Sequence, residues 1–295
     1  MSATLPSPAP TLPAPLRRPG VLRRLLSHRL AAAGLVVAAA LVIFCFLGPL
    51  LYRTDQSVTD LSAASLAPGS PGHPLGTDEV GHDVLGRLMI AGRTSLIIGL
   101  GTGLLATVIG TVYGAVAGYA GGWVDSVMMR IVDAGIAIPA LFLLLAAAAI
   151  VKPSVTSMVV ILGLVSWLVP ARLVRAEALS LRTRDYVAAV RAVGGGSARI
   201  VLRHIVPNTV GTITVNATFQ VADAILLVAY VSFLGLGVAP PATDWGGMLS
   251  DGVGNVYSGA WWLIFPPGIA IVLTVCAFNV IGDGLRDAFE IRKTR

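Results

Sequence analysis

The side chains that could do chemistry in this chain are few and lie far apart. Its two cysteines, Cys45 and Cys276, lie inside long apolar runs, and its histidines fall in different segments: His28, His73, His82 and His204. No nucleophile, base and orienting acid share a segment, and no spacing of His, Cys and acids is typical of a metal site. The sequence therefore predicts no catalytic residue, no metal site and no cofactor bound by this chain.

One group of polar residues gathers in a turn-rich stretch, at Asp78, Glu79, His82 and Asp83. A metal site is the less favoured interpretation of this acidic cluster. We expect it to cap a helix over residues 83–96 and to contact an external partner. That helix has apolar residues at helical spacing with Arg87 and Arg93 on its polar side, which predicts an interfacial helix leading into a membrane span.

Asp223 is the one ionisable residue deep inside an apolar run. An unpaired charge costs several kcal/mol in the bilayer, so its side chain should face the bundle interior or a water-filled path. Asn216 and Gln220 precede it by seven and three residues and share its helical face. We favour a substrate path lined by these three side chains. A structural hydrogen-bond partner and an ion-coupling site remain as alternatives.

The stretch "DYVAAVRAVGGGSARIVLRHIVPN", residues 185–208, concentrates arginines around three glycines. Gly194, Gly195 and Gly196 should end one helix, and Ser197 should cap a second helix that carries Arg199 and Arg203 at i and i+4. Pro207, followed by Asn208, should end that second helix after about two turns. A short helix between a glycine hinge and a proline stop indicates a docking element. The bland alternative is a solvated loop rich in arginine.

The same glycines do not form a nucleotide-binding loop. No Lys-Ser or Lys-Thr pair follows them, and no β-strand is expected before them. The sequence thus predicts that this chain does not bind ATP by itself.

The elements that position these residues are membrane helices. The 295 residues are 55% hydrophobic and 12% charged, which excludes a soluble globular domain. Six intervals lack Asp, Glu, Lys and Arg over about the length that a bilayer requires, namely 30–52, 94–124, 134–151, 153–171, 224–243 and 252–282. The fifth span should begin earlier, near Thr209. We therefore predict an all-α, polytopic protein with six transmembrane helices.

The distribution of Lys and Arg predicts the orientation. With the N-terminus inside, inside segments hold 17 of the 21 Lys and Arg residues and outside segments hold four. Both termini should be cytoplasmic. The expected organisation is a basic, partly disordered arm (1–29), a six-helix domain (30–284) and a short cytoplasmic tail (285–295). Within the domain we expect an external loop at 53–93 and a cytoplasmic loop at 172–208.

Two further patterns predict packing. Glycines recur along one face of the second span, which favours close helix approach, at Gly99, Gly103, Gly110, Gly114 and Gly118. Arg130 and Asp133, three residues apart, are expected to form an interfacial ion pair.

The arginine-rich stretch resembles the cytoplasmic "EAA" loop of bacterial ABC importer permeases. In that signature a glycine stands thirteen residues before a proline, as Gly194 and Pro207 do here. The signature's glutamate and two alanines fall on Ala188, Ala189 and Val190, so the acid is missing. Three more blocks are similar to the dipeptide/oligopeptide permease family, at residues 73–96, 118–139 and 232–249. Many relatives carry an acid where Val228 stands, so no role is carried over there.

This resemblance, to the second permease type of that family, implies a type I ABC importer permease fold in the bacterial plasma (inner) membrane. It implies a non-catalytic subunit of an ATP-driven importer of short peptides, with the 194–208 segment coupled to the ATPases. The implied partners are a homologous second permease, two cytoplasmic ATPase subunits or domains that bind ATP and Mg, an external substrate-binding protein and membrane lipid, without nucleic acid. Glutathione or a metal chelate is an alternative substrate, and an ion-coupled secondary transporter using Asp223 is an alternative class.

Overall fold

The computed structural model describes residues 21–53 and 59–293. Most of this part of the chain is helical, as predicted. The longer helices are α2 (Arg29–Leu51), α3 (Val84–Ala120), α4 (Gly122–Ala137), α5 (Ala140–Ile150), α6 (Val155–Ser166), α7 (Leu168–Leu181), α10 (Val206–Phe233) and α12 (Phe265–Lys293). The shorter ones are α1 (Val21–Ser27), α8 (Asp185–Ala192), α9 (Ser197–Ile200) and α11 (Trp245–Val253). Of the predicted basic arm, residues 1–20 lie outside the described residues.

Four helical stretches are long and apolar enough to cross a membrane, namely Arg29–Leu51, Val84–Ala120, Ser197–Phe233 and Trp261–Phe289. Two further candidates are bent pairs: α4 with α5, bent by 83°, and α6 with α7, bent by 44°. Counting each pair as one span gives the six that the sequence predicts. The sharper bend follows from Pro139. Proline disfavours helical backbone angles in the residue before it, and Ile138 is extended (φ −90°, ψ 124°).

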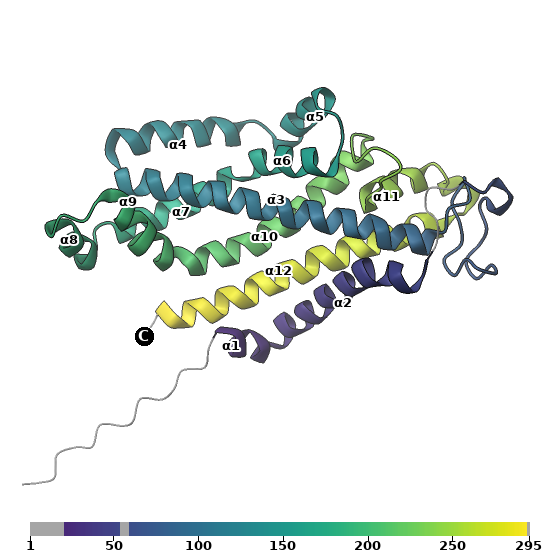
Figure 1. Ribbon diagram of the computed structural model, residues 1–295, viewed down its shortest axis with the longest axis horizontal. Coiled ribbons are helices and arrows are strands. Elements are labelled where there is room, and N and C mark those ends of the chain that lie inside the picture. Colours follow the sequence, from purple (N-terminus) through teal and green to yellow (C-terminus); the bar gives the residue numbers. More distant parts are fainter. Residues whose placement is uncertain (1–20, 54–58, 294–295) are drawn as a thin grey trace, which may run out of the picture.

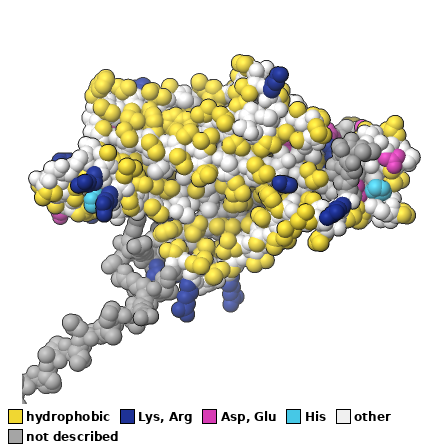
Figure 2. Space-filling model, viewed as in Figure 1, with side chains coloured by type: hydrophobic (Ala, Val, Ile, Leu, Met, Phe, Trp, Pro, Cys, Tyr) yellow, Lys and Arg dark blue, Asp and Glu magenta, His cyan; other side chains and the backbone are white. Residues whose placement is uncertain are grey.

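The long helices pack side by side, with α3 beside α10, α10 beside α12 and α12 beside α2 (Figure 1). At one end of the bundle lie α8 and α9, and at the other end lie α11 and the loop that precedes α3 (Figure 1). We call these the α8 end and the α11 end. The visible face of the bundle is broadly hydrophobic, as a lipid-facing surface must be, and basic side chains lie mainly near its margins (Figure 2).

The predicted interfacial helix over residues 83–96 does not exist as a separate element. Asp83 caps α3 by accepting a hydrogen bond from the Gly86 N–H at 2.7 Å, and the helix then continues without a break to Ala120. Its 37 residues span about 55 Å, well beyond the hydrocarbon thickness. The segment contains no proline or helix-ending cap that could separate an interfacial helix from a span.

The glycines of α3 pack as predicted, against two different helices. A Cβ at Gly103 would lie 2.7 Å from Val221 Cγ2 of α10, and one at Gly118 would lie 2.6 Å from Ala178 Cβ of α7. Such distances leave no room for a larger residue. The stripe therefore holds α3 against α10 in its first half and against α7 in its second half.

The α11 end has the largest buried cluster, built around Trp245. The indole of Trp245 is fully buried, and its Nε1 donates to the Leu88 carbonyl at 3.0 Å. Its backbone N–H donates to Ser95 Oγ at 3.1 Å. These bonds join α11 to α3 and fix the position of the loop between α10 and α11.

Candidate functional site

The glycines at the α8 end close α8 with a Schellman cap. Gly194 has a left-handed φ of 81°, and its N–H donates to the Arg191 carbonyl at 3.1 Å. The Gly195 N–H donates to the Val190 carbonyl at 2.9 Å. This pair of bonds is the usual way to satisfy the last carbonyls of a helix with glycine. The predicted helix break is therefore confirmed.

The three glycines have different roles. A Cβ on Gly195 would lie 2.5 Å from Val190 Cγ1 and 2.7 Å from the Val190 carbonyl oxygen, whereas a Cβ on Gly196 would meet nothing within 4 Å. Gly196 itself is the N-cap of α9, with no side-chain capping bond. The prediction that Ser197 is the cap is wrong, because Ser197 already occupies the first helical position.

The sequence predicted that Pro207 ends the second helix, and this prediction is wrong. α9 passes through a π-helical turn, Val201–Ile205, directly into α10. The Val206 N–H donates to the Val201 carbonyl, five residues back. Pro207 then falls in the first turn of α10, where proline is tolerated, and the wider π turn accommodates its missing N–H. Residues 197–233 thus form one continuous helical stretch. Asn208, next along, donates from Nδ2 to the His204 carbonyl at 2.5 Å.

A small buried cluster fixes this segment to the bundle. Its members are Val187 of α8, Ile200 of α9, Ile205 of the π turn and Ala178 of α7, all fully buried. Tyr119, near the end of α3, packs against them, and the Arg191 guanidinium lies 5.7 Å from the centre of the Tyr119 ring. α8 and α9 are therefore seated on the ends of α3 and α7.

The outer side of this seat is exposed. Its large or charged side chains include Tyr186, Val193, Arg199, Leu202 and Arg203, which we call the α8–α9 surface. Within the described part of the chain, Arg199 and Arg203 take part in no salt bridge. Figure 2 shows basic side chains at this end of the molecule. The surface thus offers free cationic groups beside apolar ones, a composition suited to a protein partner.

Ion pairs close to this end tie α4 to α7. Arg175 donates from Nε and Nη2 to the two carboxylate oxygens of Asp125, each at 2.6 Å. Two turns further along α4, Asp133 accepts from Arg172 at 2.6 Å. The predicted pairing of Asp133 with Arg130 is therefore wrong, because Asp133 pairs with Arg172 of α7. Arg172 and Arg175 lie about one turn apart on α7, whereas Asp125 and Asp133 lie about two turns apart on α4.

The predicted polar stripe on α10 divides into an exposed and a buried part. Asp223 is exposed, whereas Gln220 is buried and donates from Nε2 to the Ser166 carbonyl at 2.7 Å. That carbonyl lies at the bend between α6 and α7, so Gln220 stabilises the bend. Asn216 is half-buried, and its side-chain oxygen has no hydrogen-bond partner among the described residues.

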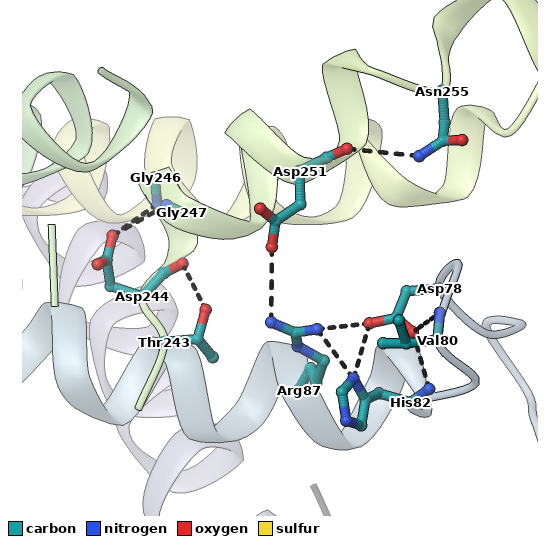
Figure 3. A network of polar contacts seen from close by, with 10 residues as sticks. All are labelled: Asp78, Val80, His82, Arg87, Thr243, Asp244, Gly246, Gly247, Asp251 and Asn255. Carbon is teal, nitrogen blue, oxygen red and sulfur yellow. Dashed lines mark hydrogen bonds and ion pairs between the residues drawn. The ribbon is translucent and has the colours of Figure 1, made fainter. Parts of the chain in front are cut away.

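A polar network at the α11 end, missed by the sequence analysis, centres on Arg87. Its guanidinium pairs with Asp78 and lies 3.2 Å from His82 Nδ1 and 3.6 Å from Asp251 of α11 (Figure 3). A cavity of about 550 Å³ adjoins it, lined in part by Ser232, Thr243 and Asp251. Burial raises the pKa of Asp251, while Arg87 acts in the opposite direction. Arg87 thus joins the loop, α3 and α11.

Asp244 lies near this cavity as the N-cap of α11. Its carboxylate accepts from the Gly246 and Gly247 N–H groups at 2.9 and 3.2 Å and from Ser232 Oγ at 2.8 Å. Burial raises the pKa of Asp244, and these hydrogen bonds lower it. The group positions α11. Among the described residues, no set of three or more His, Cys, Asp or Glu side chains could hold a metal ion.

Comparison with protein families matches two parts of the chain. Residues 110–295 match the family described as the binding-protein-dependent transport system inner membrane component. Residues 20–68 match the N-terminal transmembrane domain of oligopeptide transport permease C. The first match covers α8 to α10, the bent spans and α12, and the second covers α1 and α2.

Similar curated proteins extend over nearly the whole chain. The oligopeptide transport system permease protein OppC of Escherichia coli (strain K12) is 41% identical over 91% of this chain and 89% of its own length. The dipeptide transport system permease protein DppC of Bacillus subtilis (strain 168) is 38% identical, over 92% of this chain and 85% of its own length. The OppC protein of the same Bacillus strain is 36% identical, over 90% and 87%.

Proposed function

This chain belongs to the family of binding-protein-dependent transport system inner membrane components, and we propose on that premise that it is a permease subunit of an ATP-driven importer of short peptides. The peptide substrate is supported by similarity to oligopeptide and dipeptide permeases over about nine tenths of the chain. The chain is a non-catalytic membrane subunit, and ATP hydrolysis takes place in its partners. The chain contributes half of the translocation pathway.

The family description implies an ATPase, an external binding protein and a partner permease. In the finer form of this proposal, the partner permease is homologous to this chain and two ATPase subunits or domains, with ATP and Mg, act on the assembly. Both termini then lie in the cytoplasm together with the α8 end. The excess of Lys and Arg in the segments assigned to that side supports this orientation.

The α8–α9 surface is the proposed docking site for an ATPase. It carries unpaired arginines beside exposed apolar side chains, and its buried side is held by Val187, Ile200 and Ile205. Docking residues of this segment would be Gly194 to Ser197, Arg199 and Arg203, with Pro207 and Asn208 at its junction with α10. The Schellman cap between α8 and α9 would then be the joint about which the segment turns.

One observation carries the mechanism: the helical stretch is continuous from Ser197 to Phe233. Because no loop separates the docking segment from the span, a displacement at Arg199 would pass directly into α10. The same helix carries Asp223, exposed in the middle of an apolar span. An ionisable group at that depth is stable only beside water or another protein, so this face of α10 is the proposed wall of the peptide path.

Purification of the assembly from its native membrane, followed by reconstitution, tests this function. We expect an ATPase, a second permease and a binding protein to be recovered with the chain. Vesicles containing the assembly should accumulate labelled di- and oligopeptides with ATP and not with ADP. Uptake driven by an ion gradient, without any ATPase, would refute the proposal. Competition by glutathione or a metal chelate but not by peptides would refute the peptide substrate alone.

A further inference from the structure

The N-terminal helix α1 leaves an apolar side uncovered. Leu25 is buried, and its Cδ1 lies 3.1 Å from the position of a Cβ built on Gly284, so this side of α1 faces α12. Leu22, Leu26 and, just after the helix, Leu30 are instead 68%, 55% and 65% exposed. Their spacing of four residues places Leu22 and Leu26 on one side of the helix. An exposed leucine stripe of this kind needs an apolar environment.

Cations lie next to that stripe. Arg23 and Arg29 are exposed, and the half-buried Arg24 donates to the Ala288 carbonyl of α12 at 3.5 Å. His28, between α1 and α2, lies 3.7 Å from Asp287. The first acidic residue of the whole sequence is Asp55, so no acidic side chain precedes α2 in the sequence. Neither Arg23 nor Arg29 takes part in a salt bridge within the described part of the chain, so both are available to bind an anion.

The position of α1 decides which partner fits. α1 ends at Ser27 and α2, a 23-residue apolar span, begins at Arg29. Only His28 separates them, so α1 cannot lie more than about a helical turn from the boundary of the bilayer. At that boundary, acyl chains and phosphate oxygens are present together. A helix with leucines on one side and arginines beside them matches this arrangement.

We propose that α1 docks on an anionic lipid surface, with Leu22 and Leu26 among the acyl chains and Arg23 and Arg29 on the headgroup phosphates. This surface is distinct from the peptide path and from the α8–α9 surface. Because α1 packs on the end of α12, the lipid contact also fixes that end of α12. The function of the chain would then include recognition of lipid charge.

Depth measurements test the placement. The complete transporter, with Cys45→Ala and Cys276→Ser as background, receives single spin labels at Leu22→Cys, Leu26→Cys or Ser27→Cys. It is placed in vesicles of phosphatidylcholine or of an equal mixture with phosphatidylglycerol. We expect labels 22 and 26 to be accessible to oxygen and shielded from a water-soluble nickel complex, and label 27 to show the reverse. Equal access of nickel at all three positions would overturn the proposal, as would shielding of labels 22 and 26 from both reagents by a protein partner.

Charge substitutions test the headgroup contact. Association of spin-labelled phosphatidylglycerol, relative to spin-labelled phosphatidylcholine, should fall by up to about fivefold in Arg23→Gln and in Arg29→Gln. Arg23→Lys, which keeps the positive charge, should keep the association of phosphatidylglycerol at the level of the parent protein. The matched control is Arg53→Gln, an exposed arginine beyond the other end of α2, which should not change it. Unchanged lipid selectivity in both variants would overturn the contact. Loss of selectivity on adding inorganic phosphate would identify free phosphate as the ligand instead. Neither result depends on peptide uptake.

Discussion

Arg175 and Asp125 form the best-aligned ion pair in the described structure, with two parallel hydrogen bonds of 2.6 Å between α7 and α4. The Asp125 side chain is 9% exposed and that of Arg175 is 31% exposed, whereas the Arg172 and Asp133 side chains are about half exposed. A paired arginine that loses its partner in a partly buried site keeps the cost of desolvation without the compensating charge. Most of the electrostatic attachment of α4 should therefore come from Asp125.

Asp125→Asn is expected to destabilise the assembly by about 1 to 3 kcal/mol, because Arg175 loses its counter-charge in a partly buried site. Thermal unfolding of the detergent-solubilised complex measures this. Asp133→Asn is the matched control on the same helix, and its half-exposed pair should contribute less than about 1 kcal/mol. Equal effects of the two variants would show that the bidentate geometry adds nothing.

Gly194→Ala and Gly195→Ala should each weaken the coupling segment by about 1 kcal/mol or more. Alanine at 194 would have to adopt a φ of 81°, and alanine at 195 would collide with Val190. The measurement is peptide uptake per ATP hydrolysed, which should fall in both variants. Gly196→Ala, whose added methyl group meets nothing, should behave like the parent protein. A defect in Gly196→Ala alone would contradict this assignment of roles.

Reversing both Arg199 and Arg203 to Glu should lower peptide uptake at least about tenfold while leaving the amount of chain in the membrane unchanged. An acidic partner surface would then face like charges, which cost several kcal/mol. Uptake and peptide-stimulated ATP hydrolysis are measured together. Arg53→Glu with Lys152→Glu makes the same change of charge in two loops at the other end of the spans. Normal stimulation of hydrolysis in the Arg199 and Arg203 variant would rule out docking through these arginines.

Substitutions at Asp223 and Gln220 should have different effects, the first on transport and the second on stability, although the two residues lie only three positions apart on α10. Asp223→Asn should lower uptake severalfold without changing the amount of assembled complex. Gln220→Leu removes the bond to the Ser166 carbonyl and should cost about 1 kcal/mol of stability, the usual size of such bonds between membrane helices. Quantitative recovery of the complex, together with uptake per complex, distinguishes them. Loss of complex in Asp223→Asn with normal uptake per complex would make Asp223 structural.

Features determined by local chemistry were predictable from the sequence. Asp83 is a helix N-cap and Gly194 follows the C-cap of α8, because each satisfies orphan backbone groups within the adjoining turn. The span α2 agrees with its charge-free interval to within one residue at each end. The glycine stripe of α3 follows equally from residue type and spacing.

Features that depend on contacts between segments were not predictable in the same way. Asp133 has a basic neighbour three residues away, yet its partner is Arg172, 39 residues further along the chain. Gln220 shares a helical face with Asp223, but the bend between α6 and α7 buries it. The ion pairs of α4 had a signal in the sequence, since two acids eight residues apart face two arginines three residues apart. Recognising that signal requires knowing that α4 and α7 are neighbours.

The π turn at Val201–Ile205 also sets a rotational phase. A π turn holds one residue more than an α-helical turn, and each residue of an α-helix advances by about 100°. Rewinding this turn as plain α-helix, with all of its residues kept, would swing α9 by roughly a quarter revolution relative to α10. Arg199 would then point toward a different side of the molecule although its neighbours in sequence were unchanged. The wider winding of this one turn therefore decides which direction the docking arginines face.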